Sequence, residues 1–309
     1  ARTTSEAPPL VSATDGAPPC YVRGVEVEIL AGTPPGGGQD RAARAFASAL
    51  GVAAFVVNIP GRGGSNTWDE LSRRGADPHV AAISSPTMIT NRIHGIGAHD
   101  DVTPLAHLCT EGLAFVIPAS SGIRNAGDLV GAVTGGAGIA IATALGNVNH
   151  VAAGLIARAG GGDPGALDVR AFDSAREAVA EVLGGGAACA IVSAASVVPE
   201  LAAGSIRVVA VSTSERLAGP FRDVSTWSEV GVDCLVGTWR GIVGPPGLTA
   251  DDVAMWDELT GKAVASPEWA SAVADHHWQS TYLDAASTRA FLESERATLA
   301  EALEMIGHG

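Results

Sequence analysis

The sequence contains one run of small residues whose backbone could bind an anion, Pro34-Pro35-Gly36-Gly37-Gly38. It lies between an expected strand and an expected helix. Backbone N–H groups in such a loop can approach a ligand closely, and the positive end of the helix dipole favours negative charge there. A carboxylate would suit this loop, although the glycines could equally serve only a tight turn. Neither nucleotide fingerprint is present, because Gln39-Asp40 follows the glycines and the G-x-G-x-x-G spacing is missing.

Three other segments offer hydrogen-bond donors at the starts of expected helices. A second glycine loop spans residues 58–66, and Ser84-Ser85-Pro86-Thr87 supplies hydroxyls that could bind a carboxylate or simply cap a helix. Thr143-Ala144-Leu145-Gly146-Asn147, followed by Asn149, could face them from a second wall. We interpret His150 there as structural.

Arg240 is a single charge among apolar residues of an expected strand. A buried guanidinium without an anionic partner would be costly. Its partner could be an Asp or Glu of the protein, or a ligand carboxylate held by two parallel hydrogen bonds.

The sequence lacks the patterns expected of an enzyme or a metalloprotein. It has no G-x-S-x-G elbow or Cys–His signature, and no histidine pair spaced i, i+4 beside a Glu. We therefore expect no catalytic residue, no metal and no cofactor. Four cysteines without a C-x-x-C motif leave room for a Cys20–Cys234 disulfide or for none.

Composition limits the possible partners. The 309 residues carry a net charge of -14, which would repel nucleic acid and anionic membranes. Hydrophobic residues make up 47% of the chain, enough for a substantial core, and no apolar run approaches the roughly 18 residues of a membrane span. Because residues 1–23 are polar, rich in Pro and lack an initiator Met, we expect a flexible leader left after an export signal was removed.

Strands and helices are expected to alternate, which predicts an α/β protein with a parallel sheet covered on both faces. The expected strands are 25–30, 53–58, 80–84, 113–118, 138–142, 166–172, 188–192, 206–212 and 235–244. The expected helices are 39–50, 67–74, one from 125, 149–159, 175–183, 250–265 and 287–306. The alternation restarts after residue 118, so we expect a second lobe inserted into the first, with two crossings near 114–120 and 232–240 and a cleft at the strand ends.

An ordered set of motifs resembles the substrate-binding proteins of tripartite tricarboxylate transporters, also called the Bug family. The motifs are residues 32–44, 58–64, 84–87, 208–216, 223–227 and Trp239-Arg240-Gly241. The resemblance covers about residues 25–307. Many relatives have an Asp near position 193, whereas this chain has Ser193, which disfavours an amino-acid ligand.

The resemblance implies a type II periplasmic-binding-protein fold, in which two Rossmann-like lobes close on an organic acid around a two-crossing hinge. Lobe 1 would comprise residues 24–116 and 240–309, and lobe 2 residues 117–239. The Trp-Arg-Gly motif is similar to the branch assigned to citrate-like tricarboxylates, where the extra cation of Arg240 would suit an extra carboxylate. The implied receptor is a monomer located in the periplasm or otherwise outside the cytoplasm, which could be tethered through its native N-terminus and would deliver a tri- or dicarboxylate to a membrane permease.

Motifs and resemblance together give one set of expected ligand-binding residues: Pro35, Gly36, Gly37, Gly38, Gln39, Asp40, Asn66, Ser84, Ser85, Thr87, Thr143, Ala144, Asn147, Asn149, Ser193 and Arg240. Two other functions fit the same sequence. One is a carboxylate sensor for a membrane signalling partner, and the other is a hydrolase of small acids.

Overall fold

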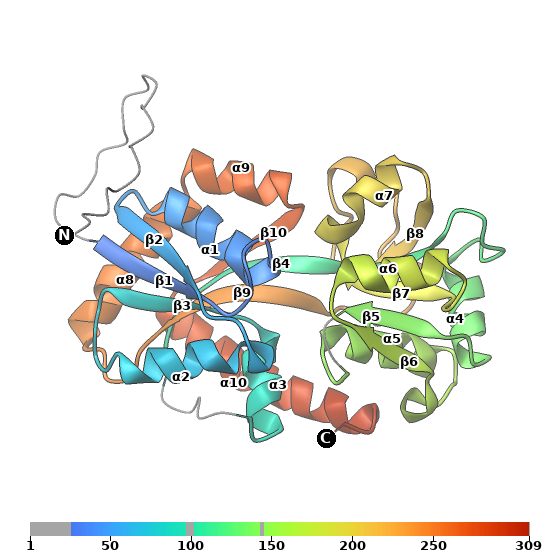
Figure 1. Ribbon diagram of the computed structural model, residues 1–309, viewed down its shortest axis with the longest axis horizontal. Coiled ribbons are helices and arrows are strands. Elements are labelled where there is room, and N and C mark those ends of the chain that lie inside the picture. The colour runs from blue at the N-terminus through green and yellow to red at the C-terminus, as the bar shows by residue number, and fades with distance from the viewer. Residues whose placement is uncertain (1–25, 97–101, 143–144, 309) are drawn as a thin grey trace, which may run out of the picture.

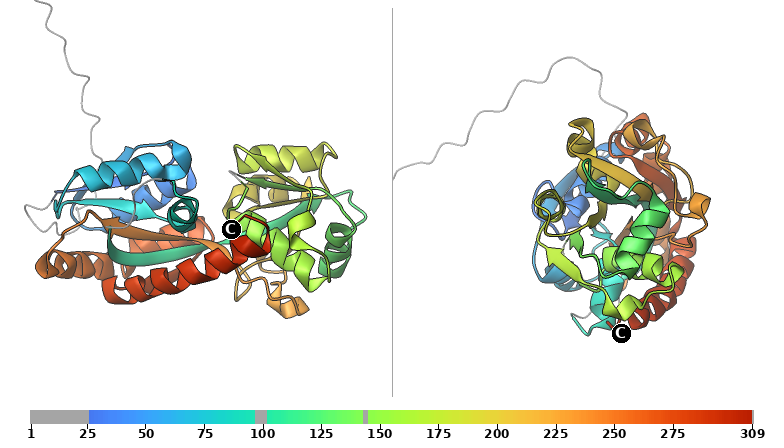
Figure 2. Two further views of the ribbon diagram at one scale, coloured as in Figure 1. Left: turned by 90° about the horizontal axis from the view of Figure 1, so that it is seen from below. Right: turned by 90° about the vertical axis from the view of Figure 1, so that its right-hand side faces the viewer.

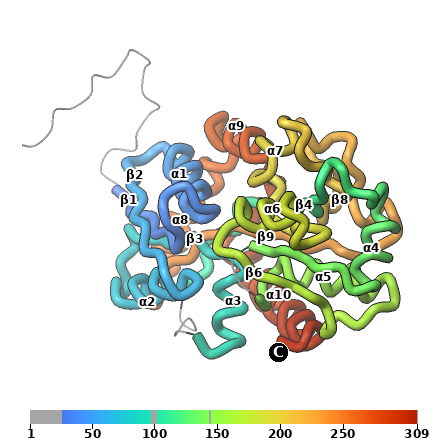
Figure 3. The backbone as a smooth tube through the Cα atoms, turned by 45° about the vertical axis from the view of Figure 1, so that its right-hand side comes forward, coloured from blue at the N-terminus to red at the C-terminus, as the bar shows by residue number. Residues whose placement is uncertain are grey.

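The computed structural model describes residues 26–96, 102–142 and 145–308, and these form two lobes side by side (Figure 1). Two strands, β4 (Thr103–Pro118) and β9 (Gly237–Gly244), lie between them. The expected leader, residues 1–23, lies outside the described residues. In Figure 3 the orange and red C-terminal segments return to the blue N-terminal lobe, so lobe 1 is built from both ends of the chain and lobe 2 is inserted into it.

The sheet of lobe 1 has the order β2-β1-β3-β9-β4, with β10 paired to β4. Its other strands are β1 (Glu26–Ala31), β2 (Ala53–Asn58), β3 (Val80–Ser84) and β10 (Trp278–Leu283). Strand β1 runs parallel to β2 and β3, whereas β9 runs antiparallel to β3 and β4. The sheet is therefore mixed. The expected parallel pairing is confirmed for β1 with β2 and β3, whereas β9 and β10 pair antiparallel because they return from lobe 2 and from the C-terminal helices.

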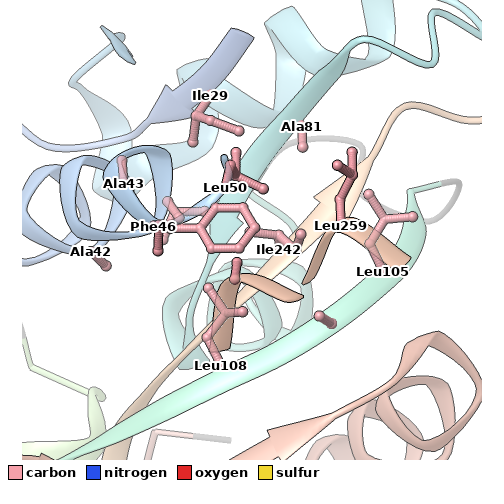
Figure 4. Packing of buried hydrophobic residues seen from close by; sticks show 14 of the residues in the cluster. Ile29, Ala42, Ala43, Phe46, Leu50, Ala81, Leu105, Leu108, Ile242 and Leu259 are labelled. Atoms are coloured by element: carbon pink, nitrogen blue, oxygen red, sulfur yellow. The ribbon is translucent and has the colours of Figure 1, made fainter. Parts of the chain in front are cut away.

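Helices cover both faces of this sheet. They are α1 (Gly38–Ala49), α2 (Ser65–Arg73), α3 (Pro86–Ile93), α8 (Ala250–Val264), α9 (Pro267–Asp275) and α10 (Ala285–Met305). The apolar face of α1 packs on the sheet through Phe46, which is fully buried against Ile29 and Ile242 and meets the edge of Trp269 at a centroid distance of 6.5 Å (Figure 4). Fixing α1 in this way fixes the position of the glycine loop before it.

Lobe 2 repeats the pattern on a smaller sheet. Its strand order is β4-β7-β5-β6, with β8 paired to β4. The elements are β5 (Ile139–Ala142), β6 (Val169–Phe172), β7 (Cys189–Ser193), β8 (Ile206–Val211), α4 (Ala126–Thr134), α5 (Val148–Ala159), α6 (Ala175–Leu183) and α7 (Val198–Ala202). Short 3-10 turns complete the chain: η1 (Arg62–Gly64), η2 (Pro164–Ala166), η3 (Ala194–Val197), η4 (Gly219–Phe221) and η5 (Ser228–Val230).

Strand β4 belongs to both lobes. Its residues up to Gly112 pair with β9, and those from Leu113 onward pair with β7 and β8. The pairing of β4 therefore changes from the sheet of lobe 1 to that of lobe 2 between Gly112 and Leu113. The expected lobe boundaries at 116/117 and 239/240 stay a prediction. Alternation of side chains within a continuous strand gives no signal at such a change of partner.

The end of α10 makes a further contact between the lobes. The helix runs along the underside of lobe 1 and ends beside lobe 2 (Figure 2). Ile306 packs with Val151 of α5, and Gly154 has no room for a Cβ because one would lie 2.4 Å from Ile306. The His94 ring also lies 2.9 Å from the carbonyl oxygen of His308.

Three cysteines, Cys109, Cys189 and Cys234, are buried free thiols. The Cys20–Cys234 disulfide is therefore absent, and Cys20 itself lies outside the described residues. Burial raises the pKa of the Cys189 and Cys234 thiols to about 12. Across the described segments, we find no helix of the length and apolarity that a membrane span requires.

Candidate ligand-binding site

A cavity of about 560 Å³ lies between the lobes. Its volume falls within the roughly 300–1,000 Å³ typical of small-molecule sites. Lobe 1 contributes the glycine loop, the start of α3 and residues of β4 and β9. Lobe 2 contributes the residues before and within the first turns of α5 and α6, together with Ser193 and Ser196.

Four helices begin at the wall of this cavity. Residues 36–38 precede or open α1, Pro86 and Thr87 open α3, residues 147–149 open α5, and residues 174–176 open α6. Each helix start carries partial positive charge, because the aligned peptide dipoles of a helix sum toward its N-terminus. Because the four starts come from both lobes, an anion between them would be attracted from opposite sides.

The floor of the cavity carries an ion pair on the two crossing strands. Arg240 of β9 donates a hydrogen bond from Nη2 to Oε2 of Glu111 on β4 at 2.6 Å, and both side chains are buried. Trp278 donates from its indole N–H to the other carboxylate oxygen at 2.9 Å. The sequence left two partners open for Arg240, and in the structure its partner is an acid of the protein.

Arg41 lies beside this pair, on the first turn of α1. Its Nη2 is 3.9 Å from Oε1 of Glu111, and its Nη1 donates to the carbonyl oxygen of Gly36 at 2.8 Å. Two guanidinium groups thus share one carboxylate. The floor keeps one net positive charge, which favours an anionic ligand.

Opposite charges on the lobe 2 wall nearly balance, because Arg176 and Asp173 both line the cavity and both are exposed. Within the described part of the chain, no hydrogen bond or ion pair is formed by the side chain of Arg176. It can therefore turn toward a ligand. The buried hydroxyl of Ser193 also has no hydrogen-bond partner among the described residues and lies on the cavity wall.

The glycine loop is shaped by residues behind it. Gly36 has a φ of 82°, which favours glycine, and a Cβ on Gly38 would lie 2.5 Å from Nη2 of Arg240. Asp40 accepts a hydrogen bond from the Gly36 N–H at 2.8 Å. Burial acts to raise the pKa of the Asp40 carboxyl, but hydrogen bonds from Arg44, Gly36 and Asn58 outweigh it and hold that pKa below its usual value.

Nine of the expected binding residues lie on the cavity wall: Gly36, Gly37, Gly38, Gln39, Thr87, Asn147, Asn149, Ser193 and Arg240. Gln39 and Asn147 are already engaged within the protein. The side-chain oxygen of Gln39 accepts from the Gly32 N–H, while that of Asn147 caps α5 by accepting from the N–H groups of Asn149 and His150. These two side chains position the loops.

Five expected residues do not line the cavity: Pro35, Asp40, Asn66, Ser84 and Ser85. Asp40 and Ser85 support the glycine loop from behind, since Ser85 accepts a hydrogen bond from Gln39 at 3.2 Å. Asn66 donates to the carbonyl oxygen of Pro60, inside the second glycine loop. That loop packs against α3 through Asn91, which donates to the Gly63 carbonyl, so it does not reach the ligand space.

Thr143 and Ala144 lie outside the described residues. The residues that sequence reasoning missed are chiefly Arg41, Glu111 and Arg176. A signal for Glu111 existed, because a lone carboxylate within the apolar run of residues 104–118 needs a cationic partner just as Arg240 does. Arg176 lies in the first turn of α6, shortly after the end of β6 at Phe172, and ligands of α/β sheets bind at such strand ends.

The fold defines a protein of two lobes with a cavity between them, as expected of a solute-binding protein. The family described as "Tripartite tricarboxylate transporter family receptor", TctC, matches residues 39–307. The chain belongs to this family, whose members are receptors of the periplasmic-binding-protein type. The resemblance to the Bug family is thereby confirmed at the level of the family.

Individual relatives are similar but distant. A UPF0065 protein of Bordetella bronchiseptica is 25% identical over 259 residues, which cover 81% of this chain and 75% of the relative. A TctC solute-binding protein from Polaromonas has a TM-score of 0.74 at 24% identity, covering 92% of this chain and 99% of the other. An R. palustris protein solved with adipate has a TM-score of 0.79 at 19% identity, covering 93% and 98%. These structures share the fold of this protein.

Proposed function

We propose that the protein is an extracytoplasmic receptor that binds a small organic dicarboxylate between its lobes and delivers it to the permease of a tripartite tricarboxylate transporter. The observation that carries this proposal is the interlobe cavity, where four helix starts converge over a floor with one uncompensated arginine charge. A receptor of this kind acts as a monomer outside the cytoplasmic membrane, facing the permease subunits.

The charge balance supports two carboxylates rather than three. Three arginines and two acids line the cavity, which leaves one net positive charge. Arg240 is already paired with Glu111, so it adds little attraction for a third carboxylate. One ligand carboxylate would lie near Arg41 and residues 36–38, and the other would face Arg176 and the start of α5. The R. palustris neighbour solved with adipate, a dicarboxylate, is consistent with this class.

A citrate-like tricarboxylate is the second candidate. It is supported by the Trp239-Arg240-Gly241 motif and by the position of Arg240 on the cavity wall. It requires the guanidinium to bind the ligand while it still holds Glu111. Arg240 can make both contacts only if the ligand binds the guanidinium nitrogen atoms that do not contact Glu111.

Binding would couple to transport through closure of the lobes. A ligand that contacts both walls stabilises the closed arrangement, because only that arrangement makes both sets of contacts. The permease could then recognise the joined surface. A membrane signalling partner could read the same surface, so isolation of the membrane partner distinguishes transport from sensing.

The test is a thermal-shift screen followed by calorimetric titration of each acid that raises the melting temperature. The acids are malate, succinate, adipate, citrate, isocitrate, tricarballylate, aromatic acids and amino acids. We expect dicarboxylates to bind, and we expect Arg41→Gln and Arg176→Gln each to weaken them at least about tenfold. Arg124→Gln, an exposed change in lobe 2 outside the cavity, is the matched control.

Other outcomes separate the candidates. Binding confined to tricarboxylates, with Arg240→Gln weakening them far more than any other acid, would favour the citrate-like assignment. Binding of an acid with equal affinity in Arg41→Gln, Arg176→Gln and the control would refute the proposed site. Turnover of a bound acid during prolonged incubation would point to the hydrolase.

A further inference from the structure

A second cavity lies on the opposite face of the two crossing strands. Its volume is about 530 Å³. Side chains alternate across β9, so that Thr238 and Arg240 face the interlobe cavity while Gly237 and Trp239 face this one. On β4, Glu111 faces the first cavity and Thr110 the second. We call this space the back cavity.

Both lobes contribute to the back cavity. Lobe 1 supplies residues of β4, β10 and α10, and lobe 2 supplies residues of α5 and of segments 212–214 and 233–236. Much of the wall is apolar, with Val151, Leu155, Trp239, Phe291, Leu299 and Met305. A concave, mostly apolar wall with a few polar groups is the usual form of a small-molecule site.

Three aromatic rings gather on the lobe 1 side. Phe291 meets the edge of His107 at a centroid distance of 4.7 Å and that of Trp239 at 5.5 Å. Glu295 stands beside them, where one carboxylate oxygen accepts a hydrogen bond from the indole N–H of Trp239 at 3.0 Å. This bond orients the carboxylate next to the rings.

The charges that line the back cavity are mostly negative. Asp233, Glu295 and Glu301 line it together with one arginine, Arg158. Burial lowers the pKa of His107 to about 4, so this imidazole adds no positive charge at neutral pH. Burial also raises the pKa of Glu295, which means that its negative charge is poorly solvated and would be stabilised by a cation.

We propose that the back cavity is a second ligand site, which takes a small apolar organic cation with an aromatic or branched aliphatic body and one protonated amine. The apolar body of the ligand lies against Trp239, Phe291, Leu155 and Leu299. Its ammonium group donates to the Glu295 carboxylate. An aromatic ring face next to a carboxylate attracts a cation by both its quadrupole and its charge. The net charge of -14 adds a long-range attraction for cations.

The position of the back cavity links its occupant to the movement of the lobes. The interlobe cavity and the back cavity lie on opposite faces of the same two strands, so a rotation about these strands that narrows one widens the other. An amine that fits the back cavity at its present width therefore opposes closure of the cleft. By linkage, a ligand that closes the cleft would weaken amine binding by the same factor.

Binding can be followed at the site itself, because the chain has only three methionines and Met305 lines the back cavity. The protein is labelled with ¹³C at the methionine methyl groups, and the signals are assigned with Met305→Leu. Phenethylammonium is titrated in, with phenethyl alcohol as the neutral probe of the same shape. We expect the Met305 signal to shift saturably with the amine, the Met255 signal to stay in place, and the alcohol to bind at least about tenfold more weakly.

Two variants test the assignment. Glu295→Gln keeps an acceptor for Trp239 but removes the charge, and should weaken the amine about tenfold. Glu293→Gln removes the same charge two residues away and should have no effect. Thr298→Phe adds bulk at an exposed cavity residue and should block binding without altering the fold. Equal affinities for amine and alcohol, an unshifted Met305 signal, or an unaffected Glu295→Gln variant would each overturn the proposal.

The coupling between the back cavity and the interlobe cavity rests on the proposed function and is measured in a separate experiment. A dicarboxylate identified in the thermal-shift screen is titrated with and without saturating phenethylammonium. We expect its affinity to fall about fivefold or more when the amine is bound. An unchanged affinity would refute the coupling, whereas amine binding in the absence of any acid depends only on the back cavity.

Discussion

Glu111→Gln should destabilise the protein strongly, although it changes one atom. Glu111 and Arg240 are 2% and 7% exposed, and the two side chains are joined by a hydrogen bond of 2.6 Å. Glutamine keeps an oxygen that can accept from Trp278 but removes the charge that compensates Arg240. Breaking a buried ion pair on one side costs about 3–5 kcal/mol, because the remaining charge is left without a partner.

A surface pair in the same protein provides the comparison. Lys262 and Glu258 are 2.5 Å apart on α8, but both side chains are more than 60% exposed. Exposed pairs of this kind contribute little to stability because solvent screens them, so Glu258→Gln should cost little. Replacing both members of the buried pair, as Glu111→Leu with Arg240→Met, should restore most of the stability, since no charge is then left in the interior.

The measurement is urea unfolding without ligand, with the midpoint and slope compared across the variants. Glu111→Gln should lower the midpoint far more than Glu258→Gln, with a similar slope. A loss below about 1 kcal/mol for Glu111→Gln would refute the reasoning, because it would mean that water screens the pair. A double variant no more stable than Glu111→Gln would show that the loss comes from packing instead of charge.

Three further predictions concern the glycine loop and the thiols. Gly38→Ala should weaken carboxylate binding about tenfold in calorimetry, because its Cβ would displace the guanidinium of Arg240. Asp40→Asn should destabilise the protein most near pH 7, and the loss should shrink as pH falls below about 4, because the unfolded wild type is protonated there first and the folded protein only at lower pH; unfolding at several pH values measures this. In a Cys20→Ser background, no thiol should react with Ellman's reagent before unfolding, because burial raises the pKa of Cys189 and Cys234.

Each of these has a result that contradicts it. Gly131→Ala, in open space within α4, is the control for Gly38→Ala, and equal affinities of the two variants would remove Gly38 from the site. The direction of the pH dependence for Asp40→Asn follows from the lowered pKa of Asp40. The stabilisation by its charge is present above the pKa of the unfolded chain and is lost as pH falls through the pKa of the folded protein. A cost that grows toward low pH would contradict it. Fast labelling of any thiol in the folded protein would contradict its burial.

The fold could be predicted from the sequence where periodicity and loops agreed. The strands 53–58 and 80–84 and the helix 175–183 lie at their expected bounds, and the glycine loop precedes α1 as expected. The sequence did not predict β10, α9 or the first half of β4. The first half of β4 depends on context, since nearly every residue of this strand is buried and it lacks the alternation that marks a half-exposed strand.

The site was predicted less completely than the fold, for a physical reason. Sequence motifs identify backbone loops well, because glycine and proline restrict geometry locally. They do not reveal which polar side chains are consumed within the protein. Gln39 and Asn147 line the cavity and Asp40 lies just behind it, yet each accepts a hydrogen bond from neighbouring backbone and so supports the protein's own loops.

Arg240 shows why charge in a cleft must be counted after internal pairing. Read alone, it supplies a cation for an additional ligand carboxylate. With Glu111 opposite it on β4, the pair is nearly neutral, and the surplus charge passes to Arg41, whose Nη2 is 3.9 Å from the same carboxylate. Selectivity between two and three carboxylates would then depend on how firmly Glu111 holds Arg240, and a relative without an acid at this position of the crossing strand would present a different charge from the same Trp-Arg-Gly motif.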